Sequence, residues 1–520
     1  MNMTQSNNKS PYTTKEKVHN RAKESIGKPM HELYKSFGIF NTTKMLKHKS
    51  FAGDAFEAWM KIPKNSRAEA DLPDAKVELK ATPYKINKDG SKSAKERLVL
   101  NIINYVSEAK ATFETSSFKE KDKTMELAFY NHNNNVSKLN WSFDETLLFT
   151  FPEKDLKIIK NDWETIHKYI IEGRAHELTE GATLYLAAAT KGASSKTLRK
   201  QPFSKIKAKQ RAYSLKSSYM TEILRNFVFG NETDPAIRKD KFKPGEVFNP
   251  IGKQSPEEFE SLVSSSELNK ESFQQIILNR INHFKGSNIL DLLKKYEIKP
   301  GSKNINSRLI AKLLGMVGNS ANNSEEIRKA NISIKTIKIN KSHKITQSMS
   351  FPSFEFSDLV KELPNTSNSH IEEAFENSAL YKEISKTFIL VVFEEQEDGS
   401  TILKGAKFWF MPSNDLNEMM HVWKNTIDVI NNGVILKYSG NRVCNNLPKK
   451  SMSSVGHVRP HTSHTSYIKN SYSSHLPTPA TWINRPNNDS KYDKSGEYMT
   501  KQGFWLNNDY ILTQIQDIIN

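Results

Sequence analysis

The chain has 520 residues, enough for about two or three domains that each bury a core of their own. It carries 76 Lys and Arg against 58 Asp and Glu, a formal net charge of +18. This excess favours a polyanionic partner, DNA or RNA before a membrane surface, although a generally lysine-rich proteome is the plain alternative. The single cysteine, Cys444, excludes an intramolecular disulfide and any cysteine-based zinc site.

The N-terminal residues 1–17 are polar and lack the apolar core of a signal peptide, so we expect a disordered arm. No stretch approaches the roughly eighteen apolar residues that a membrane span needs. The most apolar run, FILVVF at 388–393, is only as long as a strand. We therefore expect a soluble, cytoplasmic protein.

Residues 18–230 show the pattern of a compact α/β domain, a mixed sheet flanked by helices. Helical faces dominate 18–60. Strand signals follow at 76–82, 97–106, 124–130, 146–151 and 183–190. A helical period begins after Pro152 and ends at Gly173, a suitable C-cap. A basic loop then leads to Lys209 and a last strand-to-helix segment ends near Gly230.

Residues 231–270 are rich in Pro, Gly and charge without a clear period, which is typical of a linker. Beyond it, residues 271–520 repeat the first domain. The motif AYSLKSSYM at 212–220 recurs as GFWLNNDYI at 503–511, and FETSSF at 113–118 as FENSAL at 375–380. Six further residues recur at one constant offset: Pro152, Asp155, Leu156, Trp163, Ile170 and Gly173 become Pro412, Asp415, Leu416, Trp423, Ile430 and Gly433. We infer a duplication, with chance similarity of two amphipathic helices as the alternative.

The candidate site of the first copy lies in residues 54–85. Glu57 is followed by Asp71 and then by Glu78-Leu79-Lys80. Strand alternation predicts that Val77 and Leu79 face one way and Glu78 and Lys80 the other. Two or three carboxylates beside a lysine suit Mg²⁺, whose bound water can attack a phosphodiester. A charged strand edge on a solvated sheet face would explain the same pattern.

The second copy lacks this chemistry. Glu326 stands opposite Asp71, Ser333 opposite Glu78 and Lys335 opposite Lys80, and residues 310–316, opposite Glu57, contain no acid. Without an acid at the Glu78 position the carboxylates are too few to hold a catalytic Mg²⁺. The second copy should therefore keep the shape of the first and lose its activity.

Residues 40–225 resemble MutH, the GATC-directed nicking endonuclease of mismatch repair, and the MutH-related type II restriction endonucleases that cut at GATC. Four blocks in the same order carry the resemblance: FEAW around Glu57, DLPDAKVELK from Asp71 to Lys80, FETSSFKEK from Phe113 to Lys121, and AYSLK around Tyr213. The resemblance implies a restriction-endonuclease-type fold and a Mg²⁺-dependent nuclease.

The same resemblance implies roles for six residues. Glu57, Asp71 and Glu78 would bind the metal, and Lys80 would be the catalytic lysine. Lys121 falls where the family has a second active-site lysine, and Tyr213 where it has a tyrosine near the scissile phosphate. Two structural alternatives stay open: Tyr213 as a core aromatic, and Lys121 as one lysine of the solvated run KEKDK at 119–123.

For DNA contacts, the resemblance points to Lys49 and Ser50, and to a base-reading loop at Thr190, Lys191 and Gly192. Here the chain departs from the family, because the mismatch-repair member has Arg-Pro where this copy has Ala189-Thr190. The second copy has Arg459-Pro460 followed by His461, and an arginine can pair bidentately with guanine. The nearby histidines suggest zinc only weakly, because neither cysteine nor helical spacing accompanies them.

The resulting hypothesis is a two-domain type II restriction endonuclease that cuts duplex DNA at GATC, 5′ of the G. The two-domain members of this group look similar, with a catalytic MutH-like domain followed by a catalytically degenerate one that binds a second site as an allosteric effector. We expect a monomer in solution that dimerises on DNA. The alternatives are a mismatch-repair-type nicking endonuclease and a non-enzymatic, sequence-specific DNA-binding protein.

Overall fold

The computed structural model describes residues 12–35, 50–62, 69–192, 197–229, 259–302, 304–364 and 371–520. The chain divides into two compact units. The described parts of Met1–Lys191, Leu198–Ile276 and Met316–Ile332 form the first, and those of Gly192–Thr197, Ile277–Gly315 and Ser333–Asn520 form the second. Residues 1–11 of the predicted arm and 231–258 of the predicted linker lie outside the described residues.

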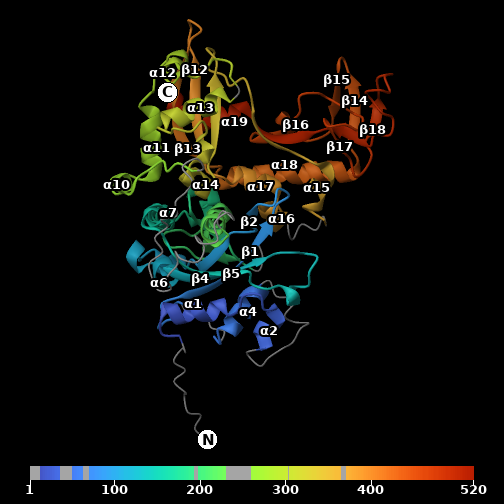
Figure 1. Ribbon diagram of the computed structural model, residues 1–520. Coiled ribbons are helices and arrows are strands. Elements are labelled where there is room, and N and C mark those ends of the chain that lie inside the picture. Colours follow the sequence, from blue (N-terminus) through green and yellow to red (C-terminus); the bar gives the residue numbers. More distant parts are fainter. Residues whose placement is uncertain are drawn as a thin grey trace. The chain divides into compact units, whose positions relative to one another are not determined.

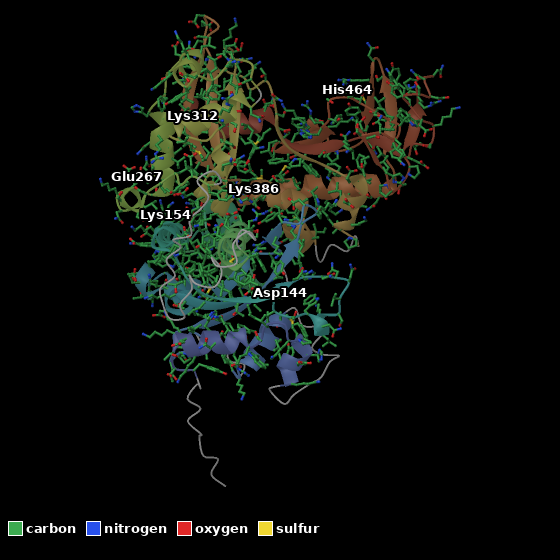
Figure 2. The ribbon with its side chains drawn as sticks, viewed as in Figure 1. Asp144, Lys154, Glu267, Lys312, Lys386 and His464 are labelled. Atoms are coloured by element: carbon green, nitrogen blue, oxygen red, sulfur yellow. The ribbon has the colours of Figure 1, made fainter. Side chains whose placement is uncertain are left out.

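The main sheet of the first unit has the strand order β2-β1-β4-β5. Its strands are β1 (Glu78–Ile86), β2 (Lys92–Ala94), β4 (Thr124–Asn131) and β5 (Glu145–Thr150). β1 runs parallel to β4, and the other pairs are antiparallel. Before β5, Asp144 (Figure 2) accepts hydrogen bonds from Tyr84 Oη at 2.9 Å and from the amide of Asn131 at 3.0 Å, which joins the ends of β1 and β4.

Three helices cover one face of this sheet: α1 (Lys15–Lys23), α2 (Met30–Lys35) and α4 (Phe51–Trp59). Figure 1 shows them together beside β4 and β5. In α4, Phe51, Ala52, Ala55 and Phe56 are buried, so one stripe of the helix faces the sheet. That stripe packs in one core with Leu79 of β1 and Leu148 of β5. This face of the sheet is therefore sealed by apolar side chains.

A second, antiparallel sheet of the first unit has the order β3-β9-β6, with β3 (Leu98–Ile102), β6 (Leu186–Thr190) and β9 (Arg211–Leu215). The predicted strand 97–106 ends early because Asn104 caps α5 (Tyr105–Glu108), its side chain accepting the amides of Val106 and Ser107. The long helix α7 (Glu153–Ile171) follows Pro152 and ends before Gly173, as predicted. Gly173 has φ +70°, and a Cβ there would meet Phe203 O at 2.7 Å.

The second unit repeats this topology. β10 (Ser333–Ile339) is parallel to β12 (Phe388–Glu395), which is antiparallel to β13 (Thr401–Trp409), as β1, β4 and β5 are arranged. The sheet β11-β20-β16 corresponds to β3-β9-β6, with β11 (Met349–Phe354), β16 (Gly456–Pro460) and β20 (Gln502–Leu506). α18 (Ser413–Asn432) follows Pro412 as α7 follows Pro152.

Matching hydrogen bonds support the same correspondence. Tyr219 Oη donates to Asp155 at 2.9 Å in the first unit, and Tyr510 Oη donates to Asp415 at 2.7 Å in the second. The positions that correspond in sequence thus make equivalent contacts in the two units, as a duplication requires.

Shorter elements complete the described chain. The first unit also contains α6 (Ser117–Asp122), β7 (Leu198–Arg199), β8 (Ala208–Lys209), α8 (Ser217–Ile223), α10 (Ser265–Leu268) and α14 (Glu325–Ala330). The second unit contains α12 (Ile289–Lys295), α13 (Ile305–Leu313), α15 (Phe356–Lys361), α16 (Ile371–Asn377), α17 (Ala379–Ile384), β14 (Ile435–Ser439), β15 (Arg442–Asn445), β17 (Ser473–His475), β18 (Thr481–Asn484), β19 (Tyr498–Thr500), α19 (Asn508–Gln514) and α20 (Gln516–Ile519). The boundary between the units falls within α11 (Phe273–Asn282). Within the ranges described, no helix is both long and apolar enough to cross a membrane.

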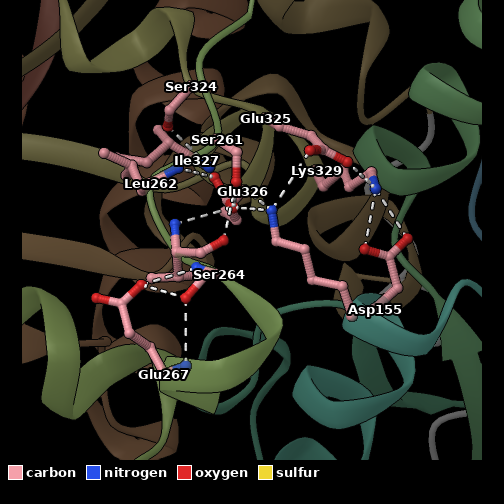
Figure 3. A network of polar contacts seen from close by, with 12 residues as sticks. Asp155, Ser261, Leu262, Ser264, Glu267, Ser324, Glu325, Glu326, Ile327 and Lys329 are labelled. Atoms are coloured by element: carbon pink, nitrogen blue, oxygen red, sulfur yellow. Dashed lines mark hydrogen bonds and ion pairs between the residues drawn. The ribbon is translucent and has the colours of Figure 1, made fainter. Parts of the chain in front are cut away.

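α14 comes from the second half of the sequence but belongs to the first unit. Figure 3 shows Lys329 of α14 pointing at Asp155, whose two oxygens accept from Lys329 Nζ at 2.9 and 2.8 Å. Lys329 also pairs with Glu325 at 2.5 Å. Glu326 accepts the amide of Leu262 at 2.9 Å and an ion pair from Lys154. Glu326, which aligns with Asp71 in sequence, is thus buried in the first unit and holds α14 there.

Candidate active site

β1 places the predicted charged residues on the face of the sheet away from α4. Val77 and Leu79 lie in the core beneath α4, so the alternating Glu78 and Lys80 project from the opposite face, as predicted. Glu78 has only 2% of its surface exposed. This burial excludes the alternative of a solvated, charged strand edge.

Glu78 collects two ammonium groups on one oxygen. Lys80 Nζ donates to Glu78 Oε1 at 2.7 Å, and Lys121 Nζ lies 3.4 Å from the same oxygen. Lys80 also reaches the carbonyl of Leu100 on β3 at 3.4 Å. Lys121 is held by α6, whose N-cap Ser116 accepts the amide of Lys119 at 3.1 Å. The side chain of Lys121 is 17% exposed, so it is not one lysine of a solvated run.

A tight turn returns Asp71 to Glu78. Leu72 and Val77 bridge each other through both backbone hydrogen bonds, at 3.0 and 3.2 Å. The amide of Asp71 then donates to Glu78 Oε2 at 3.1 Å, and Asp71 Oδ2 accepts the amide of Leu79 at 3.2 Å. The six residues between the two acids thus form the loop that brings their carboxylates together.

The pKa values reflect this crowding. Burial, and then the charge of Glu78, raises the pKa of Asp71 to about 6. Burial raises the pKa of Asp122, on α6, to about 7, although Lys80 acts in the opposite direction. For Lys80, burial lowers the pKa, but Asp122 and Glu78 outweigh it, so the pKa lies above its ordinary value and the ammonium stays charged.

Asp71 and Glu78 fit a hard divalent cation. Mg²⁺ is commonly held by one or two carboxylates plus water and substrate phosphate oxygens. A cation shared by these two acids would offset the repulsion that raises the pKa of Asp71. Across the part of the chain that the structure describes, however, no three His, Cys, Asp or Glu side chains form a group that could hold a metal.

Glu57 is the third carboxylate that the family resemblance assigns to the metal. It lies half-buried on α4, the helix that packs on the Leu79 face of β1. There its charge acts on Tyr34, whose pKa is raised by burial first, then by Asp54 and Glu57. The structure thus brings together Asp71, Glu78, Lys80 and Lys121, and a role for Glu57 as third ligand stays a prediction.

Tyr213 is fully buried on β9. Its hydroxyl donates to Glu108 Oε1 at 2.9 Å, and Trp163 Nε1 donates to the same oxygen at 2.9 Å. The other oxygen of Glu108 accepts from Ser117 Oγ, at the start of α6, at 2.9 Å. In this structure Tyr213 supports the helix that carries Lys121, which matches the core alternative for this residue.

The DNA-contact candidates of the first unit lie at element ends. Ser50 is the exposed N-cap residue of α4, and Lys49 lies outside the described residues. Thr190 ends β6, where it pairs with Arg211, and Lys191 and Gly192 after it are exposed. Lys191 donates its amide to Gln210 O at 2.8 Å, so its backbone is fixed while its side chain faces solvent.

The second unit places Arg459 where the first has Ala189. Val458 pairs with Phe504 as Ala188 pairs with Tyr213, so the next residues on β16 and β6 correspond. The exposed Arg459 lies with its guanidinium carbon 4.4 Å from the centre of the Trp505 ring.

Neighbouring residues complete this loop. Pro460 is exposed at the end of β16, and the ring of His461 is 5.2 Å from that of Trp505. His457 is buried and bonded to Asn507 at 2.7 Å, whereas His464 (Figure 2) lies beside Tyr472 at 5.0 Å. These histidines therefore have separate surroundings, and in the described chain they form no metal cluster.

Sequence reasoning missed Asp122, which lies 4.0 Å from Lys80 and is fully buried. It stands in the charged run 119–123, where it resembles one more solvated acid. Its spacing was the available signal: Asp122 follows the buried Phe118 by four residues, one helical turn, and so shares its inward face.

Comparisons with known proteins agree with this geometry. The family described as DNA mismatch repair enzyme MutH matches residues 60–162, which include Asp71, Glu78, Lys80 and Lys121. The chain is 40% identical over 523 residues to the type II restriction enzyme Sau3AI of Staphylococcus aureus, a match covering 98% of this chain and 99% of that protein. The chain belongs to the MutH-like type II restriction endonucleases.

MutH itself is a more distant and shorter match. The MutH proteins of Shigella boydii serotype 18 and Shewanella woodyi are 24% and 25% identical over 189 residues, which is 36% of this chain and 81% and 80% of theirs. As a MutH-like type II restriction endonuclease, the protein is a site-specific deoxyribonuclease and its substrate is DNA.

Proposed function

We propose that this MutH-like type II restriction endonuclease cuts duplex DNA at GATC, 5′ of the G, in a Mg²⁺-dependent reaction at the Glu78 cluster. The observation that carries the proposal is the buried group of Asp71, Glu78, Lys80 and Lys121, with two ammoniums on one carboxylate oxygen. The sequence of the site rests on the resemblance to the GATC-cutting family.

Each residue of the cluster has a chemical role in this proposal. Asp71 and Glu78 hold the divalent cation, and Glu57 joins them as the family resemblance implies. When bound, such a cation supplies a water of lowered pKa and offsets negative charge on the phosphate. Lys80 and Lys121 lie close enough to Glu78 to stabilise the charge that develops on the phosphate oxygens.

The second unit serves as a binding and effector domain in this proposal. Ser333 pairs with Phe388 as Glu78 pairs with Met125, so the position of the central carboxylate carries a hydroxyl. Arg459 is exposed and could donate two hydrogen bonds to a guanine in the major groove. Its stacking on Trp505 restricts the conformations of the side chain before DNA binds. A second copy of the site bound there would activate cleavage.

One nuclease centre per chain cuts one strand at a time. A double-strand break then requires two chains or two successive nicks, so we propose a monomer that dimerises on DNA. The mismatch-repair nickase is the weaker alternative, because the match to MutH spans 36% of the chain whereas that to the restriction enzyme spans 98%.

The proposed recognition sequence is tested by digesting two plasmids that differ only in having or lacking GATC. The enzyme with Mg²⁺ should linearise the first and leave the second intact, and the sequenced ends should begin with GATC. Ends bounded by another sequence would overturn the proposed site while leaving the nuclease itself in place. Nicked circles as the only product, without any accessory protein, would instead support the nickase alternative.

A further inference from the structure

The duplicated unit serves as an internal reference for the first. Trp163 Nε1 donates to Glu108 at 2.9 Å, and in the second unit Trp423 Nε1 donates to Glu362 at 2.9 Å. A hydrogen bond that is present in both units, including the one without the nuclease residues, is explained by its role in the fold. A buried charge present only in the first unit needs another explanation.

Asp122 is such a charge. α6 and α17 correspond closely, because Ser116 caps one through the amide of Lys119 and Ser378 caps the other through the amide of Tyr381. Six residues after each cap, Asp122 of α6 and Ile384 of α17 are both fully buried. The fold thus accepts an isoleucine where the first unit keeps a carboxylate.

The surroundings of Asp122 do not satisfy it as a structural group. It has no exposed surface, and within the described residues neither carboxylate oxygen has a hydrogen-bond partner. Lys80 Nζ lies 4.0 Å from Asp122 Oδ1, beyond hydrogen-bond distance. A buried carboxylate without hydrogen bonds destabilises a fold, so its presence here is not explained by stability.

Lys80 lies between two acids. Glu78 Oε1 accepts from its Nζ at 2.7 Å, and Asp122 Oδ1 lies at 4.0 Å. Glu78 is also held by Asp71 through a backbone amide, whereas Asp122 belongs to α6. The Lys80 ammonium therefore has two counter-charges: Glu78, which belongs to the proposed cation site, and Asp122, which does not.

We infer that Asp122 is a positioning residue that holds the Lys80 ammonium in the nuclease centre while Glu78 is engaged by a divalent cation. The inference rests on the proposed function of Asp71 and Glu78. A cation on these two acids withdraws the charge of Glu78 from Lys80 and repels the ammonium. Asp122, which is not one of the two proposed cation ligands, then remains as the counter-charge of the Lys80 ammonium. Asp122 itself contacts neither the phosphate nor the metal.

The second unit fits this inference. Lys335 occupies the register position of Lys80, opposite Leu390 as Lys80 is opposite Leu127, and it bonds to the carbonyl of Ser350 at 3.4 Å. Its pKa is lowered, mainly by burial, whereas that of Lys80 is raised. The second unit thus has the lysine but neither of the acids that flank Lys80, because Ser333 and Ile384 stand at their positions.

The test compares Asp122→Asn with Glu120→Gln, an exposed acid on the same helix. We expect Asp122→Asn to lower the single-turnover rate on a GATC duplex by about 10- to 100-fold, within the range for one electrostatic contact. Its DNA affinity in Ca²⁺ should stay within about twofold of wild type, because Asp122 touches no DNA. Glu120→Gln should match wild type in both measurements.

A double-mutant cycle separates positioning from a structural role. In a Lys80→Met background, Asp122→Asn should cause no further loss of rate, because it acts through Lys80. In the metal-free protein, Lys80→Met should lower the unfolding midpoint by stranding Asp122, and adding Asp122→Asn should restore it. Wild-type rates for Asp122→Asn, or rate losses that add in the double variant, would overturn the inference.

Two further variants keep these outcomes distinguishable. If Asp122→Asn fails to fold, Asp122→Ile, which copies the second unit, takes its place with the same expectations. Glu78→Ala separates this inference from the proposed function. If Glu78→Ala still cleaves, the proposed centre is wrong; if it is inactive while the Asp122 variants cleave normally, only the role of Asp122 is wrong.

Discussion

Lys80 and Lys335 hold the same place in two sheets of the same topology, one opposite Leu127 and the other opposite Leu390. Lys80 lies between Glu78 and Asp122, whereas Ser333 and Ile384 stand at those positions around Lys335. The lysine at this position is thus part of a charged centre in one unit, whereas in the other it is half-buried and bonded to the carbonyl of Ser350. This contrast provides matched pairs of variants for most of the following predictions.

Replacing the two lysines should have opposite consequences. Lys80→Ala is expected to lower the cleavage rate by about 10²- to 10³-fold, because it removes a cation placed for the charge of the transition state. Lys335→Ala should leave single-turnover cleavage of a one-site duplex within about twofold of wild type. Quenched-flow or gel assays of both variants check this prediction, and equal losses would contradict the assignment of one centre per chain.

The pKa of Asp122 predicts how stability depends on pH. Because burial raises its pKa to about 7 in the folded state, the folded protein binds this proton more tightly than the unfolded chain does. This tighter proton binding stabilises the folded protein. The stabilisation is fully present below the ordinary aspartate pKa of about 4 and is lost as the pH rises through about 7. Urea unfolding of metal-free protein should therefore show that Asp122→Asn gains stability relative to wild type between pH 5 and 8. A pH-independent difference would contradict this prediction.

The effector role of the second unit predicts a phenotype for Arg459. Arg459→Ala should slow cleavage of a two-site plasmid to about the rate of a one-site plasmid, because a lost bidentate pair costs about 1–3 kcal/mol of discrimination. Cleavage of one-site DNA should change little. Lys491→Ala, another exposed cation of the second unit, is the control and should retain any two-site advantage. An Arg459→Ala enzyme that keeps this advantage would refute the role of the loop.

Lys329 and Asp155 form a buried pair that can be tested by stability alone. Both side chains are at most 5% exposed, so Lys329→Met should destabilise the first unit by about 3–5 kcal/mol by leaving Asp155 without its cation. Lys338→Met removes the cation of a more exposed pair with Glu395 and should cost less than about 1 kcal/mol. Chemical unfolding followed by tryptophan fluorescence measures both. Similar losses for the two variants would show that burial does not set the strength of these pairs.

Much of the site follows from local sequence. Alternation along Val77–Lys80 is enough to separate the core side of β1 from the charged side, and the spacing of Asp71 from Glu78 suits the turn that Leu72 and Val77 close. The repeated topology could also be anticipated from sequence, because Tyr219 and Tyr510 align and each makes a hydrogen bond to an aspartate. These features depend on neighbours along the chain or on a repeat within it.

Other features depend on packing that sequence does not contain. Asp122 looks solvated in its charged run, and only the docking of α6 reveals its burial beside Lys80. Glu57 lies on α4, where its charge acts on Tyr34, and its role as a metal ligand stays a prediction. α14 lies in the second half of the sequence, yet Lys329 anchors it in the first unit. Helical spacing from Phe118 places Asp122 on the inward face of α6, but the partners in such long-range contacts are set by the fold and not by neighbouring residues.

The most direct measurement is cleavage of a GATC duplex by Glu78→Gln and Ser333→Ala, two substitutions at equivalent positions of the two sheets. Both enzymes are first shown to bind the duplex in Ca²⁺. With Mg²⁺, Glu78→Gln should lose cleavage while Ser333→Ala cuts as fast as wild type. Cleavage by Glu78→Gln at the wild-type rate would show that the buried Glu78 cluster is not the nuclease centre.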